Sequence, residues 1–145
     1  MKLEDCFYCT KDERLEKLMI KVCTIDCADI YLFKDQKHLG RCVVALDEHY
    51  TEIYQIPEEK LNRFMKVVSN VSFVITKLFN ADKINYAVYG DLVSHFHIHI
   101  VPKKKDELQW GKPFTDDIEK KILSEDEYKK YITLLNKELK NNSSI

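Results

Sequence analysis

The chain has 145 residues, of which 45% are hydrophobic and 32% charged, and its formal net charge is −1. These values are typical of a globular domain large enough to bury a core, so we expect one domain over residues 1–145. The balanced charge argues against a dedicated nucleic-acid-binding protein, and no apolar run reaches the roughly 18–20 residues of a membrane-spanning helix. The charged N-terminus lacks the apolar segment of a signal peptide, which predicts a cytoplasmic location with cysteines as thiols or metal ligands.

The first half of the chain predicts three strands and a long helix. Residues 18–23, 29–33 and 41–46 are rich in strand-forming side chains, and a turn at 35–40 precedes the third strand. The helix should begin at Pro57, which two acidic residues follow, and end near Asn80. Its apolar residues recur three and four positions apart: Leu61, Phe64, Val68, Val71, Ile75 and Leu78.

The second half predicts a hairpin and a C-terminal helix. Residues 84–89 and 93–101 read as two strands that turn near Gly90 and Asp91. Ser124 and Glu127 have the spacing of a capping box and open a helix over about 124–140, after which residues 141–145 should fray. Without repeats or low-complexity linkers, these elements predict an α+β domain around an antiparallel sheet.

Three of the five histidines lie at alternate positions in residues 95–99. Because successive side chains of a strand point to opposite faces, His95, His97 and His99 would share one surface, whereas a helix would scatter them. Imidazole can act as a nucleophile, a proton donor or a metal ligand near neutral pH. The cluster therefore predicts a functional site.

The pattern from His95 to Val101, His-φ-His-φ-His-φ-φ with φ apolar, resembles the signature of the histidine triad (HIT) family of nucleotide hydrolases and transferases. Weaker similarities extend over roughly residues 6–114, and the branch resembled is that of bacterial diadenosine polyphosphate hydrolases. They lie at Cys6-x-x-Cys9, Phe33-Lys34-Asp35, the strand ending at His49, Asn85-Tyr86-Ala87, Gly90-Asp91 and Pro102-Lys103. The resemblance implies a five-stranded antiparallel sheet, two main helices and a homodimer whose two sheets align into a larger one.

The same resemblance implies a mechanism. His97 would attack the α-phosphorus of a purine nucleotide, giving a nucleotidyl-histidine intermediate that water hydrolyses. His99 would contact the phosphate oxygens or the leaving group and supply a proton. Dinucleoside polyphosphates are the preferred substrates and nucleoside phosphoramidates the next. Two alternatives stay open: a nucleotidyltransferase using the same intermediate, and a zinc-stabilised nucleotide-binding module without turnover.

Several residues are expected to bind the substrate by this resemblance. Asp35 is similar to the family's acid that binds the ribose hydroxyls, and Phe33 would be a wall of the base pocket. Backbone and polar groups from Asp91 to Ser94 would hold the α-phosphate. Asn85 lies in a segment that resembles the family, and Trp110 resembles an aromatic residue that reaches the other subunit's site, although a plug under a loop is an equal alternative.

Two substrate-site residues depart from the family's usual pattern. Arg41 stands where members often carry histidine, and Asp91 stands where they carry glutamine or asparagine, with Leu92 in place of the serine that commonly follows. An anionic Asp91 would repel phosphate unless it is neutralised. We therefore expect Arg41 to pair with Asp91.

The N-terminal cysteines predict a metal site. Cys6 and Cys9 have the C-x-x-C spacing with which two thiolates bind one tetrahedral ion, and the βαβ context of a redox pair is absent. The resemblance adds His49 and His95 as the remaining ligands of a closed, structural zinc site. The other three cysteines are expected in the core. His38 and the run 103–105 are expected on a solvated surface, with attraction of polyphosphate as the alternative for that run.

Overall fold

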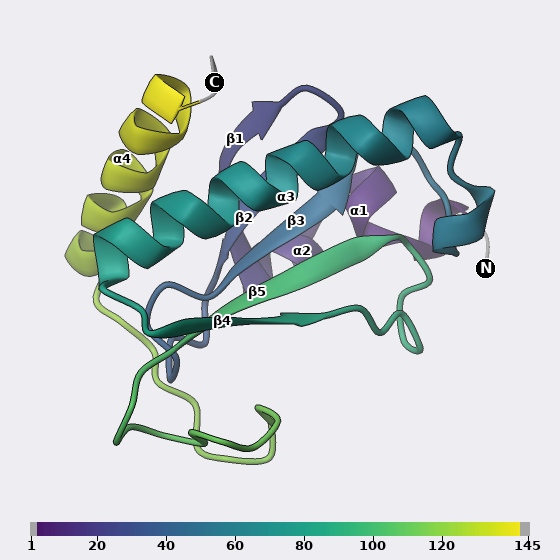
Figure 1. The fold of residues 1–145 in the computed structure, drawn as a ribbon. Helices are drawn as coiled ribbons and strands as arrows, with labels where there is room; N and C mark the ends of the chain where they lie inside the picture. The colour runs from purple at the N-terminus through teal and green to yellow at the C-terminus, as the bar shows by residue number, and fades with distance from the viewer. Residues whose placement is uncertain (1–2, 143–145) are drawn as a thin grey trace.

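The computed structural model describes residues 3–142 as a five-stranded sheet with helices on both faces (Figure 1). In chain order the elements are η1 (Leu3–Asp5), α1 (Phe7–Thr10), α2 (Glu13–Leu18), β1 (Met19–Ile25), β2 (Ala28–Phe33), β3 (Cys42–Leu46), η2 (Ile53–Gln55), α3 (Glu58–Phe79), β4 (Lys83–Ala87), β5 (His97–Lys103) and α4 (Glu125–Asn142). None of the helices in this part of the chain is both long and apolar enough to cross a bilayer.

The strands pair in the order β1-β2-β3-β5-β4, and every pairing is antiparallel. The predicted α+β class with a five-stranded antiparallel sheet is therefore confirmed. Strand β5 lies between β3 and β4, and its register sets His97 opposite Ala45 and His99 opposite Val43. His97 and His99 therefore lie on an inner strand of the sheet, and hydrogen bonds to a strand on each side hold its backbone in place.

The two faces of the sheet have different coverings. Helices α3 and α4 lie across one face, and the short α1 and α2 lie on the other (Figure 1). The α3 face holds the larger core, to which β5 contributes Ile98 and Ile100. On the α1 face, Tyr31, Val43 and Ala45 pack against residues of the N-terminal helices. Alternation along β5 therefore turns His97 and His99 toward α1, as the spacing of the histidines predicts.

The expected hairpin is wrong in its detail. Strand β4 ends at Ala87 and β5 begins only at His97, so nine residues, 88–96, connect them. In this connection the backbone hydrogen bonds leave the ladder: Phe96 N–H donates to the carbonyl of Tyr50, and His95 N–H to that of Val93. The sequence near Gly90 does not predict so long a connection, because the departure of Phe96 from the ladder depends on Tyr50, which lies 46 residues earlier in the chain.

The helices differ from the prediction mainly at the N-terminus. Helices α1 and α2 lie before residue 19, where the sequence predicted no helix, and the Asp12 side chain caps α2 by accepting from Arg14 N–H. The capping box of α4 is confirmed by mutual bonds between Ser124 and Glu127. Helix α4 continues to Asn142, which corrects the frayed tail at 141 and 142, whereas 143–145 lie outside the described residues.

The segment between β5 and α4, residues 104–124, forms a strap over the turn that follows β2. Lys37 Nζ donates to the carbonyls of Thr115 and Ile118, and His38 Nε2 lies 2.8 Å from Gln109 Oε1. The buried Lys103 ammonium donates to two carbonyls of the same strap. The surface positions expected for His38 and Lys103 are therefore wrong, because their polar groups are used to tie the strap down.

Candidate active site and metal cluster

His97 and His99 line one cavity of about 370 Å³ on the α1 face. Its other walls come from the N-terminal helices and β1, from the end of β2, from the connection before β5 and from the strap. They are Phe7, Tyr8, Leu18, Met19, Phe33, Tyr89, Gly90, Asp91, Leu92, Val93 and Asp116. Mostly apolar walls with a few polar groups converging on them are typical of a small-molecule site.

The orientation of His97 is set by its own backbone neighbourhood. Its Nδ1 lies 2.5 Å from the carbonyl oxygen of His95, and a carbonyl can only accept, so Nδ1 carries the proton. Burial lowers the pKa of His97, and its ring lies 4.8 Å from that of Tyr8. A neutral imidazole protonated at Nδ1 keeps a lone pair on Nε2, which is the form that attacks an electrophile.

His99 has the opposite arrangement. Arg41 Nη2 lies 3.2 Å from Nδ1 of His99, and a guanidinium can only donate, so Nδ1 is the acceptor. Burial, reinforced by the charge of Arg41, lowers the pKa of His99 to about 3. The ring is therefore neutral with its proton on Nε2. In this cavity the two Nε2 atoms therefore differ: that of His97 carries a lone pair, and that of His99 carries a proton.

Arg41 is 1% exposed and is held from three sides. Its guanidinium lies 4.1 Å from the ring centre of Phe33 and 4.9 Å from that of Phe114, and Nη1 donates to Asp116 Oδ1 at 2.7 Å. The expected pairing of Arg41 with Asp91 is therefore wrong. The strap delivers a different carboxylate from 75 residues further along the chain, whereas Asp91 lines the cavity from the connection before β5.

The other expected substrate residues are distributed over three cavities. Asp91 lines the histidine cavity, and Ser94 closes the same loop by donating to the carbonyl of Gly90. Asp35 lines a neighbouring cavity of about 210 Å³ that shares Leu18, Phe33 and Asp116 with the first, and its Oδ1 accepts from the backbone of Lys37 and Lys121. Asn85 and Trp110 line another, of about 480 Å³.

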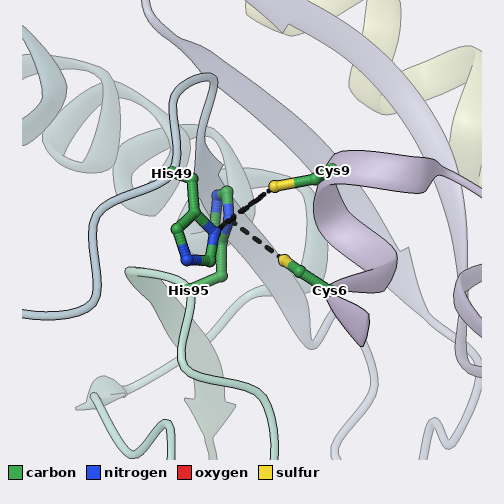
Figure 2. Close-up of side chains that lie close together, drawn as sticks. All are labelled: Cys6, Cys9, His49 and His95. Atoms are coloured by element: carbon green, nitrogen blue, oxygen red, sulfur yellow. Dashed lines mark hydrogen bonds between the residues drawn. The ribbon is translucent and has the colours of Figure 1, made fainter. Parts of the chain in front are cut away.

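Four metal-binding side chains converge beside the histidine cavity. Cys6 and Cys9 at α1, His49 after β3, and His95 before β5 point toward one another (Figure 2). Their ligand atoms all lie within 4.8 Å of one another. The predicted set of four residues is therefore brought together from three segments of the chain, and this cluster could hold a metal ion.

The donor atoms fit a tetrahedral ion. His95 Nδ1 lies 3.4 Å from Cys6 Sγ, 3.6 Å from Cys9 Sγ and 3.2 Å from His49 Nδ1. Zinc bonds of about 2.0–2.3 Å place tetrahedral ligand atoms about 3.3–3.8 Å apart. His95 Nε2 donates to the carbonyl of Leu46 at 2.8 Å, so its Nδ1 presents a lone pair to the cluster.

Three residues that the sequence did not mark as functional contribute to the site. Tyr8 lies against both His95 and His97, with ring centres 5.1 and 4.8 Å away. Phe114 and Asp116 hold Arg41 from the strap. Tyr8 could have been noted between the two cysteines of the metal motif. Asp116 had no such signal, because it is one of several acids in a polar segment without periodicity.

Comparisons with known proteins agree with this geometry. Residues 26–106, more than half of the chain, match the HIT domain. The chain is 27% identical over 86 residues to a bis(5′-adenosyl)-triphosphatase of Dictyostelium discoideum, a match that covers 56% of this chain and 58% of that protein. The curated relatives are each matched over less than two-thirds of their own length.

Solved structures show the same fold. A histidine triad protein of Marinobacter aquaeolei superposes with a TM-score of 0.82 at 23% identity, covering 90% of this chain and 96% of that one. A zinc-bound histidine triad family protein of Mycobacterium smegmatis gives 0.70 at 17% identity and covers 99% of both chains. From the family match, the histidine pattern on β5 and the fold, we conclude that the chain belongs to the HIT domain family.

Proposed function

We propose that this protein hydrolyses purine nucleotides by attack on the α-phosphorus, with dinucleoside polyphosphates as the preferred substrates and nucleoside phosphoramidates next. The observation that carries the proposal is the hydrogen bond from His97 Nδ1 to the His95 carbonyl, which leaves a lone pair on Nε2 for attack on phosphorus. A covalent nucleotidyl-His97 intermediate would form and then be hydrolysed by water. The resulting imidazolium would be stabilised by the same carbonyl.

Groups around His97 suit the charge that develops on phosphate. His99 has no hydrogen-bond partner at Nε2 among the described residues, so its N–H is available to a phosphate oxygen. The loop residues from Gly90 to Val93 line the same cavity, and backbone and polar groups from Asp91 to Ser94 would hold the α-phosphate. Phe33 would be the wall of the base pocket, and Asp35 in the adjoining cavity would bind the ribose.

The cluster of two cysteines and two histidines would bind zinc in a structural role. A closed site with four protein ligands leaves no position for water, so zinc would supply rigidity rather than Lewis-acid catalysis. Cys6 and Cys9 would anchor the N-terminus, and His95 would fix the segment that ends at the nucleophile. His95 would thus do two things: its side chain would bind the ion, and its backbone carbonyl orients His97.

The proposed reaction is tested by incubating the protein with diadenosine tetraphosphate in ¹⁸O-labelled water. We expect AMP and ATP as products, with the label on AMP, because water attacks the phosphorus that His97 has captured. Quenching during turnover in alkaline denaturant, in which a phosphorus–nitrogen bond to histidine survives, should yield an AMP adduct on the peptide that contains His97. Binding without products would support a nucleotide-binding module, and products that require an added sugar phosphate would indicate a transferase.

We also propose a homodimer formed through β4. This strand is an edge of the sheet, and Tyr86, Val88 and Tyr89 are exposed along it and just after it. An apolar edge strand is a template for pairing with a second copy, which would extend the sheet across two chains. Asn85 and Trp110 line a cavity beside this edge, so in such a dimer Trp110 would serve the partner subunit's site.

Tyr86→Glu should convert the dimer to a monomer. Two copies of the edge would then bring carboxylates together at the seam, where like charges destabilise a strand pair. Light scattering coupled to gel filtration measures the mass directly. Tyr54→Glu is the matched control, since Tyr54 is also exposed but lies in η2. A Tyr86→Glu protein that remains dimeric would contradict the β4 interface.

A further inference from the structure

The contact between Arg41 and His99 has a consequence for the kind of substrate this site can use. Arg41 occupies a rigid position: it follows a turn in which the buried Gln36 amide donates to the Arg41 carbonyl and accepts from Gly40 N–H. Its guanidinium is held between two aromatic rings and bonded to Asp116. A side chain fixed at this many points has little freedom to move away from His99.

An arginine in this position determines which nitrogen of His99 carries the proton. The guanidinium has five N–H donors, no acceptor, and a proton that it does not release. Nδ1 of His99 must therefore accept, because a proton there would point at the hydrogens of Nη2, the nitrogen that lies 3.2 Å away. The ring keeps its single proton on Nε2. An imidazole, which can accept as well as donate, would impose no such constraint at position 41.

A neutral imidazole locked in this tautomer can donate a hydrogen bond but cannot give its proton away. Loss of the Nε2 proton would leave an imidazolate, which is not formed near neutral pH. The other titratable groups at this cavity are Tyr8, Tyr89, Asp91, His97 and Asp116. Of these, the rings of His97 and Tyr89 lie nearest to the His99 ring, at 5.2 and 6.3 Å between centres, and His97 must hold its lone pair to attack. Neither of the two imidazoles at the cavity can therefore protonate a basic leaving group.

We propose that Arg41 is a positioning residue that makes His99 a permanent hydrogen-bond donor, so that the site selects nucleotides whose leaving group departs as an anion. This inference rests on the proposed function. As the bond from His97 Nε2 to phosphorus forms, the bond to the leaving group breaks and that group keeps the electron pair. A nucleoside polyphosphate or sulfate leaves as a stable anion. An amine would have to leave as an amide ion, because neither imidazole can give it a proton.

The tautomer can be measured without any substrate. With ¹⁵N-histidine in the intact protein, two-bond correlations between ring protons and nitrogens should show His99 protonated at Nε2 only, from about pH 8 to about pH 5.5. In Arg41→Gln the amide oxygen can accept from Nδ1, so His99 should titrate within this range. Asp116→Asn should loosen Arg41 and produce a partial effect; its side chain is 58% exposed, so this variant should fold even if Arg41→Gln does not.

The selection is measured by the ratio of kcat/KM for diadenosine tetraphosphate to that for adenosine 5′-phosphoramidate. General acid catalysis contributes about 10²–10⁴-fold, so its absence should favour the tetraphosphate at least about 100-fold. Arg41→Gln and Arg41→His should narrow the ratio about tenfold or more, because His99 can then become a cation and protonate the amine. Adenosine 5′-phosphosulfate, whose sulfate leaves as an anion, should behave like the tetraphosphate.

Arg63→Gln is the matched control, because it removes an arginine–aspartate pair between α3 and the turn after β1 and should leave both measurements unchanged. A purely structural role for Arg41 would lower both activities equally and keep the ratio constant, which would overturn the inference. A proton on Nδ1 of His99 in the unmodified protein would overturn it as well. Absence of turnover with every nucleotide would instead refute the proposed function, and the NMR result would still decide the role of Arg41.

Discussion

Replacing His97 by alanine should lower kcat for diadenosine tetraphosphate at least about 10⁴-fold while changing the Kd of the nucleotide less than about threefold. Removal of a nucleophile that forms a covalent intermediate costs this much or more in other enzymes. Binding should persist, because the walls of the cavity, the loop from Gly90 to Ser94 and His99 stay in place. Rapid-quench kinetics and calorimetric titration measure the two quantities separately.

Two variants make this result interpretable. His97→Asn keeps a polar side chain of similar size without the nucleophile, so its kcat should fall as far as that of the alanine variant. Leu92→Ala removes a cavity-lining side chain that is 93% exposed and should change kcat only a few-fold. If the loss in His97→Ala appeared equally in Kd, this histidine would be a substrate contact and another group would be the nucleophile.

Disrupting the metal cluster should have the largest effect on stability. Cys6→Ser or chelation should lower the free energy of unfolding by at least about 3 kcal/mol, which corresponds to about 10 °C in Tm. The cluster joins α1, the loop after β3 and the segment before β5, and its loss would leave the buried lone pair of His95 without the ion that we propose it binds. Thermal unfolding with and without added zinc measures the effect.

Cys23→Ser is the control for the cysteine substitutions, since Cys23 lies on β1 outside the cluster and should cost less than about 1 kcal/mol. Activity should fall together with stability in Cys6→Ser, because the His95 carbonyl orients His97. Metal analysis of the purified protein gives an independent check. Equal stability of Cys6→Ser and the unmodified protein, or a protein that binds no transition metal, would contradict a structural metal.

Much of the site was predictable because it depends on local geometry. A strand turns alternate residues to one face, so the spacing of His97 and His99 predicts their common cavity. The Cys6-x-x-Cys9 spacing likewise places two thiols on one turn of chain. Secondary structure followed from strand-forming residue types for β2 and β3 and from apolar residues that repeat with the helical period for α3 and α4.

Other features depend on contacts between distant segments. The sequence suggested Asp91 as the partner of Arg41, whereas the structure pairs Arg41 with Asp116. The strap selects Asp116, because its carbonyls satisfy Lys37 and Lys103 and so fix its path over the turn. Burial of His38 has the same origin. No local pattern encodes which of several polar residues a long loop brings to a given place.

The sequence by itself determined the family, the sheet and the candidates for nucleophile and metal ligands, because those properties follow from residue type and short-range spacing. Tertiary structure alone decided the protonation of the two cavity imidazoles. At His97 the deciding group is the backbone carbonyl of His95, and at His99 it is the guanidinium of Arg41, which lies 58 residues earlier in the chain. A carbonyl can only accept and an arginine can only donate, so the same side chain receives opposite roles two positions apart.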